Sequence, residues 1–478
     1  MKKRRSWFMA VVVLAIALGI ATYWYVDDWL MPGPQVYSIK QLTAGRESNR
    51  GHFYDLSLRW LCVHVSVPDE AQWTYDKTHQ VFDLDQQGKQ INEFIWKRPP
   101  GGLITQQQRY GGTREVYHQT HKTDSDLLVV DQSFLDGKSK THRLGIYGLH
   151  MIAHVLVAEE GERLIVIYRV PLRALSILAS VGQSPFVNYV PVDYTCIADV
   201  WEVSSGKLVK QIMLGMPNWG EWLLSGDGQW LVQLEMESEP FSVRPNKAFE
   251  VKPAIPRGVL IINTTTGERR TILEKPYEAE SFGAYDGKII GKQLMVFHSK
   301  ITNQSATQFS VSFRNHGSTM YDLATGNASS WAWTDPWLQA NDAPQGLGTP
   351  GWLAYQRVQD RGWPSFLRKM AEWMNYDLNS NHPLGLLWET TFFDADTREI
   401  RYQKTVTIPN HQAGGVLHGQ SNGSNALVME SYKNNSLEQF IYRWKVPFTV
   451  YSPWWSRSAG VLVVILVMAT YWLICRRR

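Results

Sequence analysis

Two pairs of histidines have spacings that could place both rings on one metal ion. His118 and His121 are three residues apart, and His150 and His154 are four apart. Such spacings bring two side chains together on a helix. Both stretches are instead predicted to be loop or strand, so we expect no metal site at either pair.

Acidic side chains recur at one position of a repeated sequence pattern. Asp83, Glu202, Asp322 and Asp394 each follow a bulky apolar residue and precede a turn. A carboxylate in this place usually accepts hydrogen bonds from turn amides, so we expect a structural role. His-Glu-x-x-His and P-loop motifs do not occur. The sequence therefore assigns no catalytic residue, no cofactor-binding residue and no metal ligand, and we expect no cofactor.

The repeated pattern is a short apolar strand, a polar residue and a turn that ends in glycine. It is clearest at residues 201–206 (WEVSSG), 262–267 (INTTTG) and 321–326 (YDLATG). The seven copies, two of them weak, are anchored at residues 82, 130, 201, 262, 321, 393 and 442. A second tight turn precedes some copies, as in residues 226–230 (GDGQW), so each unit contains two hairpins.

Units with two hairpins that recur at roughly 40–50 residues are typical of the four-stranded blades of a β-propeller, and the longer spacing here, about 60 residues on average, indicates insertions in some blades. We expect an all-β fold, a seven-bladed propeller with six to eight blades compatible with the spacing. Short helical insertions are predicted in the two widest gaps, at 171–181 and 364–377, because each opens with proline and places apolar residues three and four apart.

The second predicted helix has one apolar face that either packs on the propeller or docks on a membrane or partner. The residues of this possible docking face are Phe366, Leu367, Met370, Trp373 and Met374.

The region 36–450 resembles the WD40-like and quinoprotein-like families of propeller repeats. Trp201-Glu202 approximates the Trp-Asp dipeptide of WD40 blades, and Asp322, Thr325, Gly326 and Trp331 fit one quinoprotein repeat. The resemblance implies a propeller architecture. A single fit does not support a quinone cofactor, and no activity follows from architecture.

Both ends of the chain carry apolar segments long enough to span a bilayer. Residues 7–26 follow four basic residues, and residues 459–475 precede three. Because basic residues stay in the cytoplasm, we expect cytoplasmic tips at 1–6 and 476–478. A linker at 27–35, the propeller at 36–450 and an interfacial linker at 451–458 would then be extracytoplasmic. Tyr23, Trp24, Trp454 and Trp455 would form the outer aromatic belt, and Trp7, Tyr471 and Trp472 the inner one.

The first apolar segment has one alternative interpretation, a cleaved signal peptide. Small residues at 17–21 follow a basic head and an apolar core, as a cleavage site requires. The apolar run continues through residues 23–25, which favours an anchor.

Charge and cysteine content narrow the classes of partner. The formal net charge of +4 includes seven basic residues in the two tips, so the region between them is slightly acidic. We therefore expect no nucleic-acid partner. Cys62 and Cys196 lie in apolar, strand-like stretches and are either buried thiols or, less simply, a disulfide pair.

The sequence predicts an integral membrane protein whose propeller acts as a binding or scaffolding module for a protein or envelope partner. The alternative is an enzyme, hydrolase-like or dehydrogenase-like, with a site at the central channel of the propeller. An enzyme should converge charged or histidine side chains at that channel, whereas a scaffold should present an apolar or aromatic patch.

Overall fold

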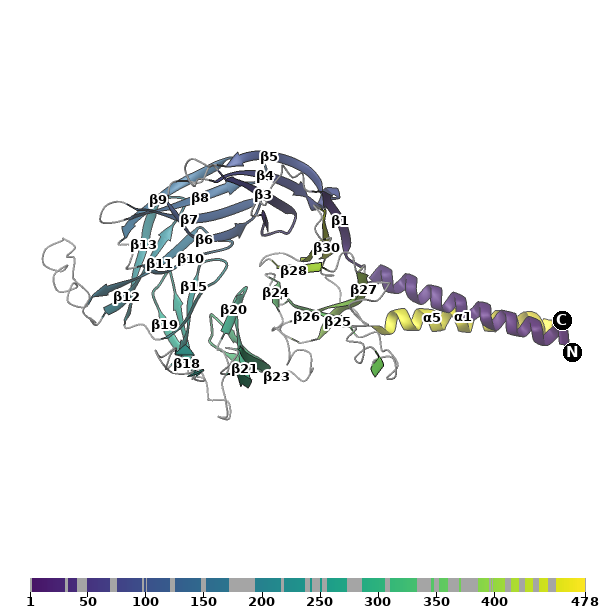
Figure 1. Cartoon of the computed structure of the whole chain (residues 1–478). Helices are drawn as coiled ribbons and strands as arrows, with labels where there is room; N and C mark the ends of the chain where they lie inside the picture. Colours follow the sequence, from purple (N-terminus) through teal and green to yellow (C-terminus); the bar gives the residue numbers. More distant parts are fainter. Residues whose placement is uncertain are drawn as a thin grey trace. The chain divides into compact units, whose positions relative to one another are not determined.

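A computed structural model gives the fold of the chain (Figure 1). It describes residues 2–30, 33–40, 50–68, 75–96, 99, 101–120, 125–147, 152–171, 194–215, 219–236, 241–242, 250–251, 256–272, 286–305, 310–332, 345–347, 352–359, 369–370, 386–394, 397, 399–408, 414–420, 426–432, 438–445 and 453–477.

The described strands form seven four-stranded antiparallel sheets, together with a short ribbon of β16 (Phe241–Ser242) and β17 (Glu250–Val251). The first three sheets follow the chain in order. Their strands are β2 (Arg50–Tyr54), β3 (Trp60–Pro68), β4 (Tyr75–Asp83) and β5 (Lys89–Trp96); β6 (Gly102–Arg109), β7 (Gly112–Thr120), β8 (Ser125–Ser133) and β9 (Ser139–Tyr147); and β10 (Ile152–Val157), β11 (Arg163–Pro171), β12 (Tyr194–Glu202) and β13 (Lys207–Gly215). A 3-10 turn, η1 (Leu84–Gln86), joins β4 to β5.

The next three sheets have the same order of neighbours. Their strands are β14 (Trp219–Leu224), β15 (Trp230–Met236), β18 (Pro256–Asn263) and β19 (Arg269–Ile272); β20 (Asp286–Ile290), β21 (Gln293–Ser305), β22 (Ser310–Asp322) and β23 (Ala328–Ala332); and β24 (Gln345–Leu347), β25 (Trp352–Gln359), β26 (Leu386–Asp394) and β27 (Ile400–Ile408).

The last sheet joins the two ends of the chain. Its strands are β28 (Gly414–Gln420), β29 (Ala426–Tyr432), β30 (Glu438–Lys445) and β1 (Gln35–Lys40), so the first strand of the chain supplies the fourth strand. The helix α1 (Lys2–Leu30) precedes β1, and α5 (Pro453–Arg477) follows β30. α1 thus includes the first residues of the stretch expected as a linker, and α5 includes most of the expected interfacial linker.

The predicted repeat is confirmed by the strand order. All seven anchors lie on the third strand of a sheet, on β4, β8, β12, β18, β22, β26 and β30. In five sheets the residue that directly follows the third strand is fully buried and donates its amide to a carbonyl between the first two strands. These residues are Leu84, Phe134, Val203, Thr264 and Leu323. Both hairpins of a sheet therefore lie at one edge, which we call the turn end. The seventh copy has no hairpin because β1 takes the place of its fourth strand.

The chain divides into two compact units. Unit 1 holds both helices, β1, β30 and the strands β25 to β27, and unit 2 holds the five complete sheets from β2 to β23. Within unit 2 the first strands contact one another in succession: β6 with β10, β10 with β14, β14 with β20 and β20 with β24. Four-stranded sheets whose first strands follow one another in this way are the blades of a propeller.

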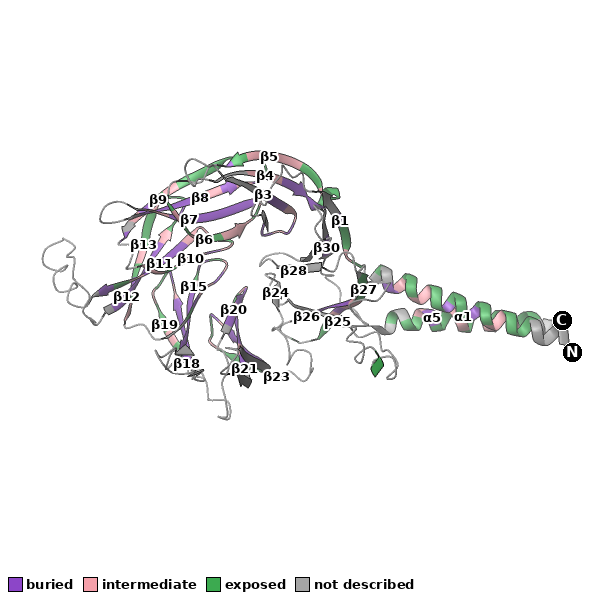
Figure 2. Ribbon diagram, viewed as in Figure 1, coloured by how far each residue is buried: buried purple, intermediate pink, exposed green. Residues whose placement is uncertain are grey.

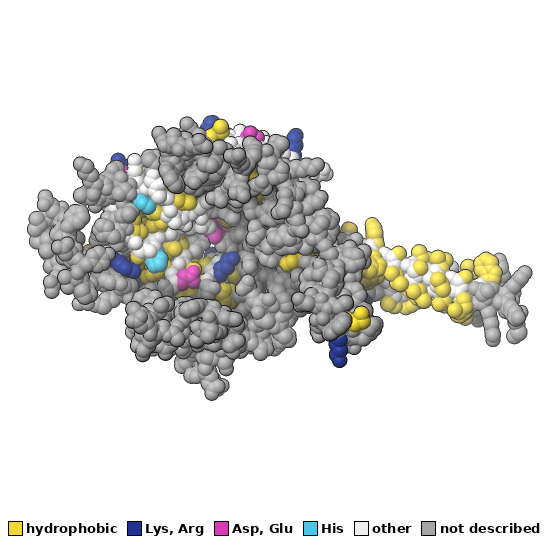
Figure 3. Space-filling model, in the orientation of Figure 1, with side chains coloured by type: hydrophobic (Ala, Val, Ile, Leu, Met, Phe, Trp, Pro, Cys, Tyr) yellow, Lys and Arg dark blue, Asp and Glu magenta, His cyan; other side chains and the backbone are white. Residues whose placement is uncertain are grey.

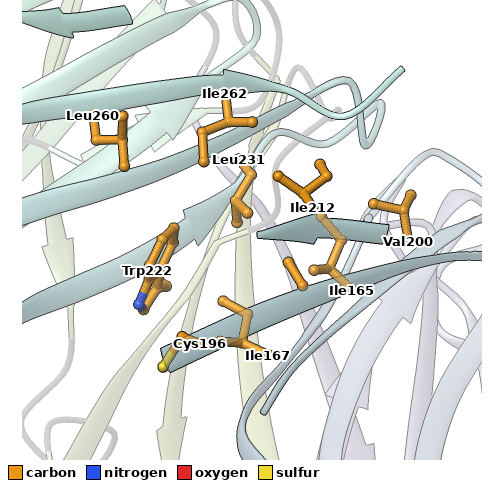
Figure 4. Packing of buried hydrophobic residues seen from close by; sticks show 10 residues of the cluster. Ile165, Ile167, Cys196, Val200, Ile212, Trp222, Leu231, Leu260 and Ile262 are labelled. Carbon is orange, nitrogen blue, oxygen red and sulfur yellow. The ribbon is translucent and has the colours of Figure 1, made fainter. Parts of the chain in front are cut away.

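Apolar side chains fill the space between neighbouring sheets. Figure 4 shows one such cluster, in which Ile165 and Cys196 of one sheet lie near Trp222 and Leu231 of the next. A second cluster joins β15 and β18 to β21 and β22. The second and third strands of the sheets contain runs of buried residues (Figure 2), because each of these strands is covered on both faces by a neighbouring sheet.

A side chain on the outer strand of one sheet repeatedly binds the turn of the next. Asn92 of β5 donates to the carbonyls of Phe134 (3.1 Å) and Leu135 (3.0 Å). Arg270 of β19 donates to the carbonyl of Ala324 at 2.9 Å. Lys210 of β13 donates in the same way to the carbonyls that follow β18, at Thr265 (3.2 Å) and Thr266. These bonds hold successive turns in register.

The predicted insertions fall almost entirely outside the described residues. All of 171–181 after Pro171 does so, as do Phe366, Leu367, Trp373 and Met374 of the predicted docking face. Lys369 and Met370 are helical, and Met370 is 52% exposed.

We predict that glycine is required where it ends a repeated turn. Gly267 and Gly326 have φ of 78° and 77°, and a Cβ on either would approach a side chain of the neighbouring sheet at 3.0–3.1 Å. Gly326→Ala should lower the free energy of unfolding by about 1 kcal/mol or more. Urea unfolding in detergent would measure the change. Gly226→Ala is the matched control, since Gly226 is also in a turn but lacks a positive φ. An equal effect of both substitutions would contradict the prediction.

Candidate functional site

The densest group of charged side chains lies at the turn end of the second and third sheets. Arg114 of β7 has a fully buried side chain, and its Nε and Nη2 lie 2.5 and 2.7 Å from the two carboxylate oxygens of Asp131 on β8. Its Nη2 also donates to Glu162 Oε2 at 2.9 Å, in the turn before β11. Arg109 donates to the same two carboxylates at 3.1 and 2.6 Å. Two arginines and two acids therefore form one neutral network.

The electrostatics of this network follow from burial and pairing. Burial alone would raise the pKa of Asp131, but hydrogen bonds and charge from Arg114, and then from Arg109, hold that pKa below its ordinary value. Burial opposes ionisation of Glu162 too, and the same two arginines lower its pKa. Both acids are therefore anionic at neutral pH, and neither is poised to accept or release a proton.

Bonds at the turn end join four successive sheets. The Gly111 amide donates to Asp55 Oδ2 at 3.1 Å, which connects the first two sheets. The network of Arg114 connects the second to the third. The Glu160 and Gly161 amides donate to the Gly226 carbonyl at 2.8 and 3.0 Å, which connects the third to the fourth. The buried network is thus one link in a longer series.

A groove of about 390 Å³ lies beside the network at the turn end of the third and fourth sheets. It is lined by Glu162, Arg163, Glu202, Val209, Asp227, Gln229 and Thr265. Its polar groups are engaged locally: Arg163 Nη1 donates to the Thr264 hydroxyl at 2.5 Å, and Asp227 and Glu202 accept hydrogen bonds from serine hydroxyls. With three carboxylates and one guanidinium, the lining offers mainly hydrogen-bond acceptors.

The recurring acidic residues occupy the turns that the sequence predicts. Asp322 accepts from the amide and hydroxyl of Thr325 at 2.7 and 2.9 Å, and Asp394 accepts from the Thr397 amide at 2.9 Å. Asp83 accepts from the Asp85 amide at 2.9 Å and also pairs with Arg59 at 3.0 Å. Glu202 binds the Ser205 hydroxyl instead of an amide. Three of the four acidic side chains thus accept hydrogen bonds from turn amides, as expected from the sequence.

One histidine of each pair lies among the described residues. His118 lies on β7 and His154 on β10, while His121 and His150 lie outside the described residues. Burial, followed by the charge of Arg169, lowers the pKa of His154. In the part of the chain that the structure describes, no group of three or more His, Cys, Asp or Glu could hold a metal ion.

Cys62 and Cys196 are buried thiols and do not form a disulfide. Cys62 Sγ lies 3.3 Å from His79 Nδ1 on the neighbouring strand β4. Cys196 lies on β12, where burial raises the pKa of its thiol. A raised pKa keeps the thiol protonated and unreactive.

Residues 419–423 (GQSNG) match the Gly-x-Ser-x-Gly spacing of serine hydrolases. In those enzymes the serine lies on a turn from a strand into a helix of an α/β fold. Here residues 419–420 end β28, the next element is the strand β29, and Ser421 lies outside the described residues. The surrounding topology therefore differs from the one that gives the motif its catalytic meaning.

The sequence does not identify the network of Arg109 and Arg114 with Asp131 and Glu162. Asp131 belongs to a weak copy of the repeat and occupies the same position as Asp83, which was a usable signal. Its partners Arg114 and Glu162 are 17 and 31 residues away in sequence, on other strands and turns, and no local pattern connects them.

No family model matches the sequence, and no curated protein matches it. Among solved structures, the chain resembles an acylaminoacyl peptidase of Pyrococcus horikoshii at 9% identity and a TM-score of 0.39, over 83% of this chain and 52% of that one. It resembles the β-propeller domain of the Trilobed protease from Pyrococcus furiosus at 9% identity and 0.38, over 85% and 98%. A Synechocystis apocarotenoid oxygenase matches at 10% identity and 0.31, over 60% and 62%.

These similarities are too distant to carry an activity. The chain spans about half the length of the acylaminoacyl peptidases that it matches. The assignment of four-stranded blades rests on the strand order and inter-sheet contacts of this chain.

We predict that the buried network stabilises the fold above its acidic pKa values. Because both folded pKa values lie below those of the unfolded chain, about 4, the contribution is present above pH 4 and is lost as the pH falls through the folded values. Asp131→Asn should lower the free energy of unfolding at pH 7 by about 3 kcal/mol, because Arg114 stays buried with one acid fewer. The substitution should also make the free energy of unfolding depend less steeply on pH below pH 5.

The matched control is Asp85→Asn, which removes a half-exposed partner of Arg59 at 3.5 Å. It should change the free energy of unfolding by less than about 1 kcal/mol. Urea unfolding at pH 3.5, 5 and 7 measures both variants. A network that contributes nothing would leave Asp131→Asn as stable as the control.

Proposed function

We propose that this protein is a membrane-anchored, extracytoplasmic binding or scaffolding module. The observation that carries the proposal is the pair of terminal helices, whose described side chains on the face shown in Figure 3 are mostly apolar. Val13, Leu14, Leu462 and Ile465 are each more than half exposed. Exposed apolar surface of this extent is costly in water, by about 25 cal/mol per Å², and is favourable in lipid.

Burial separates these helices from the core helices of soluble proteins. They are long and apolar enough to cross a bilayer, yet only 11% and 6% of their apolar windows are buried. A core helix of the same composition would be mostly buried. Lipid is therefore the environment that suits both terminal helices.

The contact between the helices supports retention of the first one as an anchor. Ala15 and Gly19 form a small-xxx-small stripe on α1, and Gly19 lies directly against Gly460 of α5. A Cβ on Gly460 would lie 2.8 Å from the Gly19 carbonyl oxygen. Close backbone approach through small residues is the usual way in which helices associate within a bilayer. A cleaved signal peptide would leave the Gly460 face without this partner.

The charge of the two tips supports the orientation. α1 and α5 are antiparallel, so both termini lie at the far end of the helix pair (Figure 1). Residues 2–5 and 476–478 are all basic, and basic tips remain cytoplasmic. The β-sheets between the helices would then lie on the opposite side of the membrane.

The partner is proposed to be a protein or another envelope component. The charged groups at the turn end bind one another, which suits a rigid display surface. Of the five residues in the predicted docking face, Met370 is described and is exposed, as a docking face requires.

Reporter fusions test the orientation. Reporters placed after Arg5, within the turn at 204–205 and after Arg478 should show cytoplasmic, extracytoplasmic and cytoplasmic locations. An N-terminal tag that is lost from the mature protein would show cleavage, and an extracytoplasmic reporter after Arg478 would contradict the two-span topology.

We predict that Gly460→Leu separates the helices. The leucine side chain would collide with the α1 backbone, which cannot move aside as a flexible side chain can. Phe8 and Tyr471 have ring centroids 6.0 Å apart, so a Phe8→Cys, Tyr471→Cys pair reports the contact by cross-linking with a short bismaleimide. The yield should fall several-fold in Gly460→Leu. Ser458→Leu, at an exposed position of α5, should leave the yield unchanged.

A further inference from the structure

The outer boundary of the hydrocarbon can be located on α1 from its exposed aromatic residues. Trp7 and Trp24 are 70% and 61% exposed, and the 17 helical steps from one to the other span about 26 Å. This length is close to the thickness of a bilayer core, and tryptophan favours the interface at both sides. Tyr25, which is 76% exposed, lies at the same level as Trp24. Trp29, which is 75% exposed, lies about 7 Å farther along the helix than Trp24, still within a headgroup layer that begins near residue 25.

Asp27 lies just beyond this boundary and binds a strand of the sheet region. Its Oδ2 is 3.2 Å from Lys404 Nζ on β27, and the two side chains are only 12% and 13% exposed. Asp27 is about 4 Å farther along the helix than Trp24, while each headgroup layer is roughly 5–8 Å thick. The ion pair is thus at the depth of the headgroups. Reduced water at this depth strengthens the attraction between the two charges.

The pair connects residues far apart in sequence within unit 1. β27 is the edge strand of the sheet β24-β25-β26-β27, so no other strand of that sheet stands outside it. Val406 lies two residues beyond Lys404 on the same face and is partly exposed. The turn residue Thr397, at the other end of the strand, is exposed and about 20 Å from Lys404 along the chain.

We propose that the C-terminal half of β27 rests in the lipid headgroup layer, held there by the Asp27–Lys404 pair. The occupant of this surface is the phospholipid bilayer that α1 and α5 span, so the inference rests on the proposed function. The aspartate at the helix exit fixes the height and tilt of the sheet, which a flexible linker would leave free.

Fluorescence quenching in nanodiscs tests this arrangement with the full chain. The background is Cys475→Ser, because Cys62 and Cys196 are buried. An environment-sensitive dye is attached to Val406→Cys or to Thr397→Cys, in phosphatidylcholine that contains a lipid with a nitroxide on its headgroup. Quenching at Val406 should exceed that at Thr397 by at least twofold. Asp27→Asn should bring the two values together, and the charge exchange Asp27→Lys with Lys404→Asp should restore the difference.

A third label distinguishes failure of the inference from failure of the anchor. Ile16 is 48% exposed in the middle of α1, and a dye at Ile16→Cys should be quenched by a nitroxide on the acyl chain. Quenching at Ile16 without any excess at Val406 would overturn the contact of β27 and leave the spans intact. No quenching at Ile16 would overturn the membrane anchor itself. An excess at Val406 that persists in Asp27→Asn would show contact with lipid but refute the role of the ion pair.

Discussion

The antiparallel pairing of the first strand with the last one determines where the two terminal helices join the sheets. Gln35, at the start of β1, is opposite Arg443, near the end of β30, and the register continues to Lys40 opposite Glu438. The start of β1 follows α1 and the end of β30 leads to α5, so this register brings the two helix connections together. Two helices at opposite ends of a 478-residue chain can then pack side by side. A shift of register would separate their origins.

In the proposed bilayer, the helices would gain little from burying apolar surface against each other, because the acyl chains are equally apolar. Close packing at Gly19 and Gly460 contributes to the association, and the β1–β30 ladder adds backbone hydrogen bonds between the segments that adjoin the two helices. The ion pair of Asp27 with Lys404 is a third link, between α1 and β27. Each link alone is modest, but all three connect elements of unit 1, so forming any one lowers the entropic cost of the others.

The sequence predicts the sheets well and the charged network poorly, for a physical reason. All seven repeat anchors are on third strands, because that strand is covered on both faces and ends in a tight turn, and both constraints leave local traces in the sequence. The weakness of the seventh copy has the same explanation, since β1 replaces its hairpin. The Arg114 network and the Asp27–Lys404 pair leave no such trace, because their partners are far apart in the chain and any arginine or lysine could have filled the role. The histidine pairs have a spacing that has chemical meaning on a helix, but His118 lies on the strand β7 and His154 on the strand β10, in agreement with the strand or loop expected from the sequence.

The distribution of polar bonds explains how sheets of such different sequence keep one geometry. Within each of five sheets a buried residue after the third strand donates its amide to the first hairpin, and this bond depends on the backbone alone. Between sheets the same task is performed by asparagine, lysine or arginine, each reaching a carbonyl of the next turn. The backbone bond fixes the shape of a blade, and the variable side chain sets its position relative to the next one. The sequence can therefore diverge at the turn end as long as a side-chain donor of suitable length remains. The repeat stays recognisable by its period and strand order, although no single residue is common to all copies.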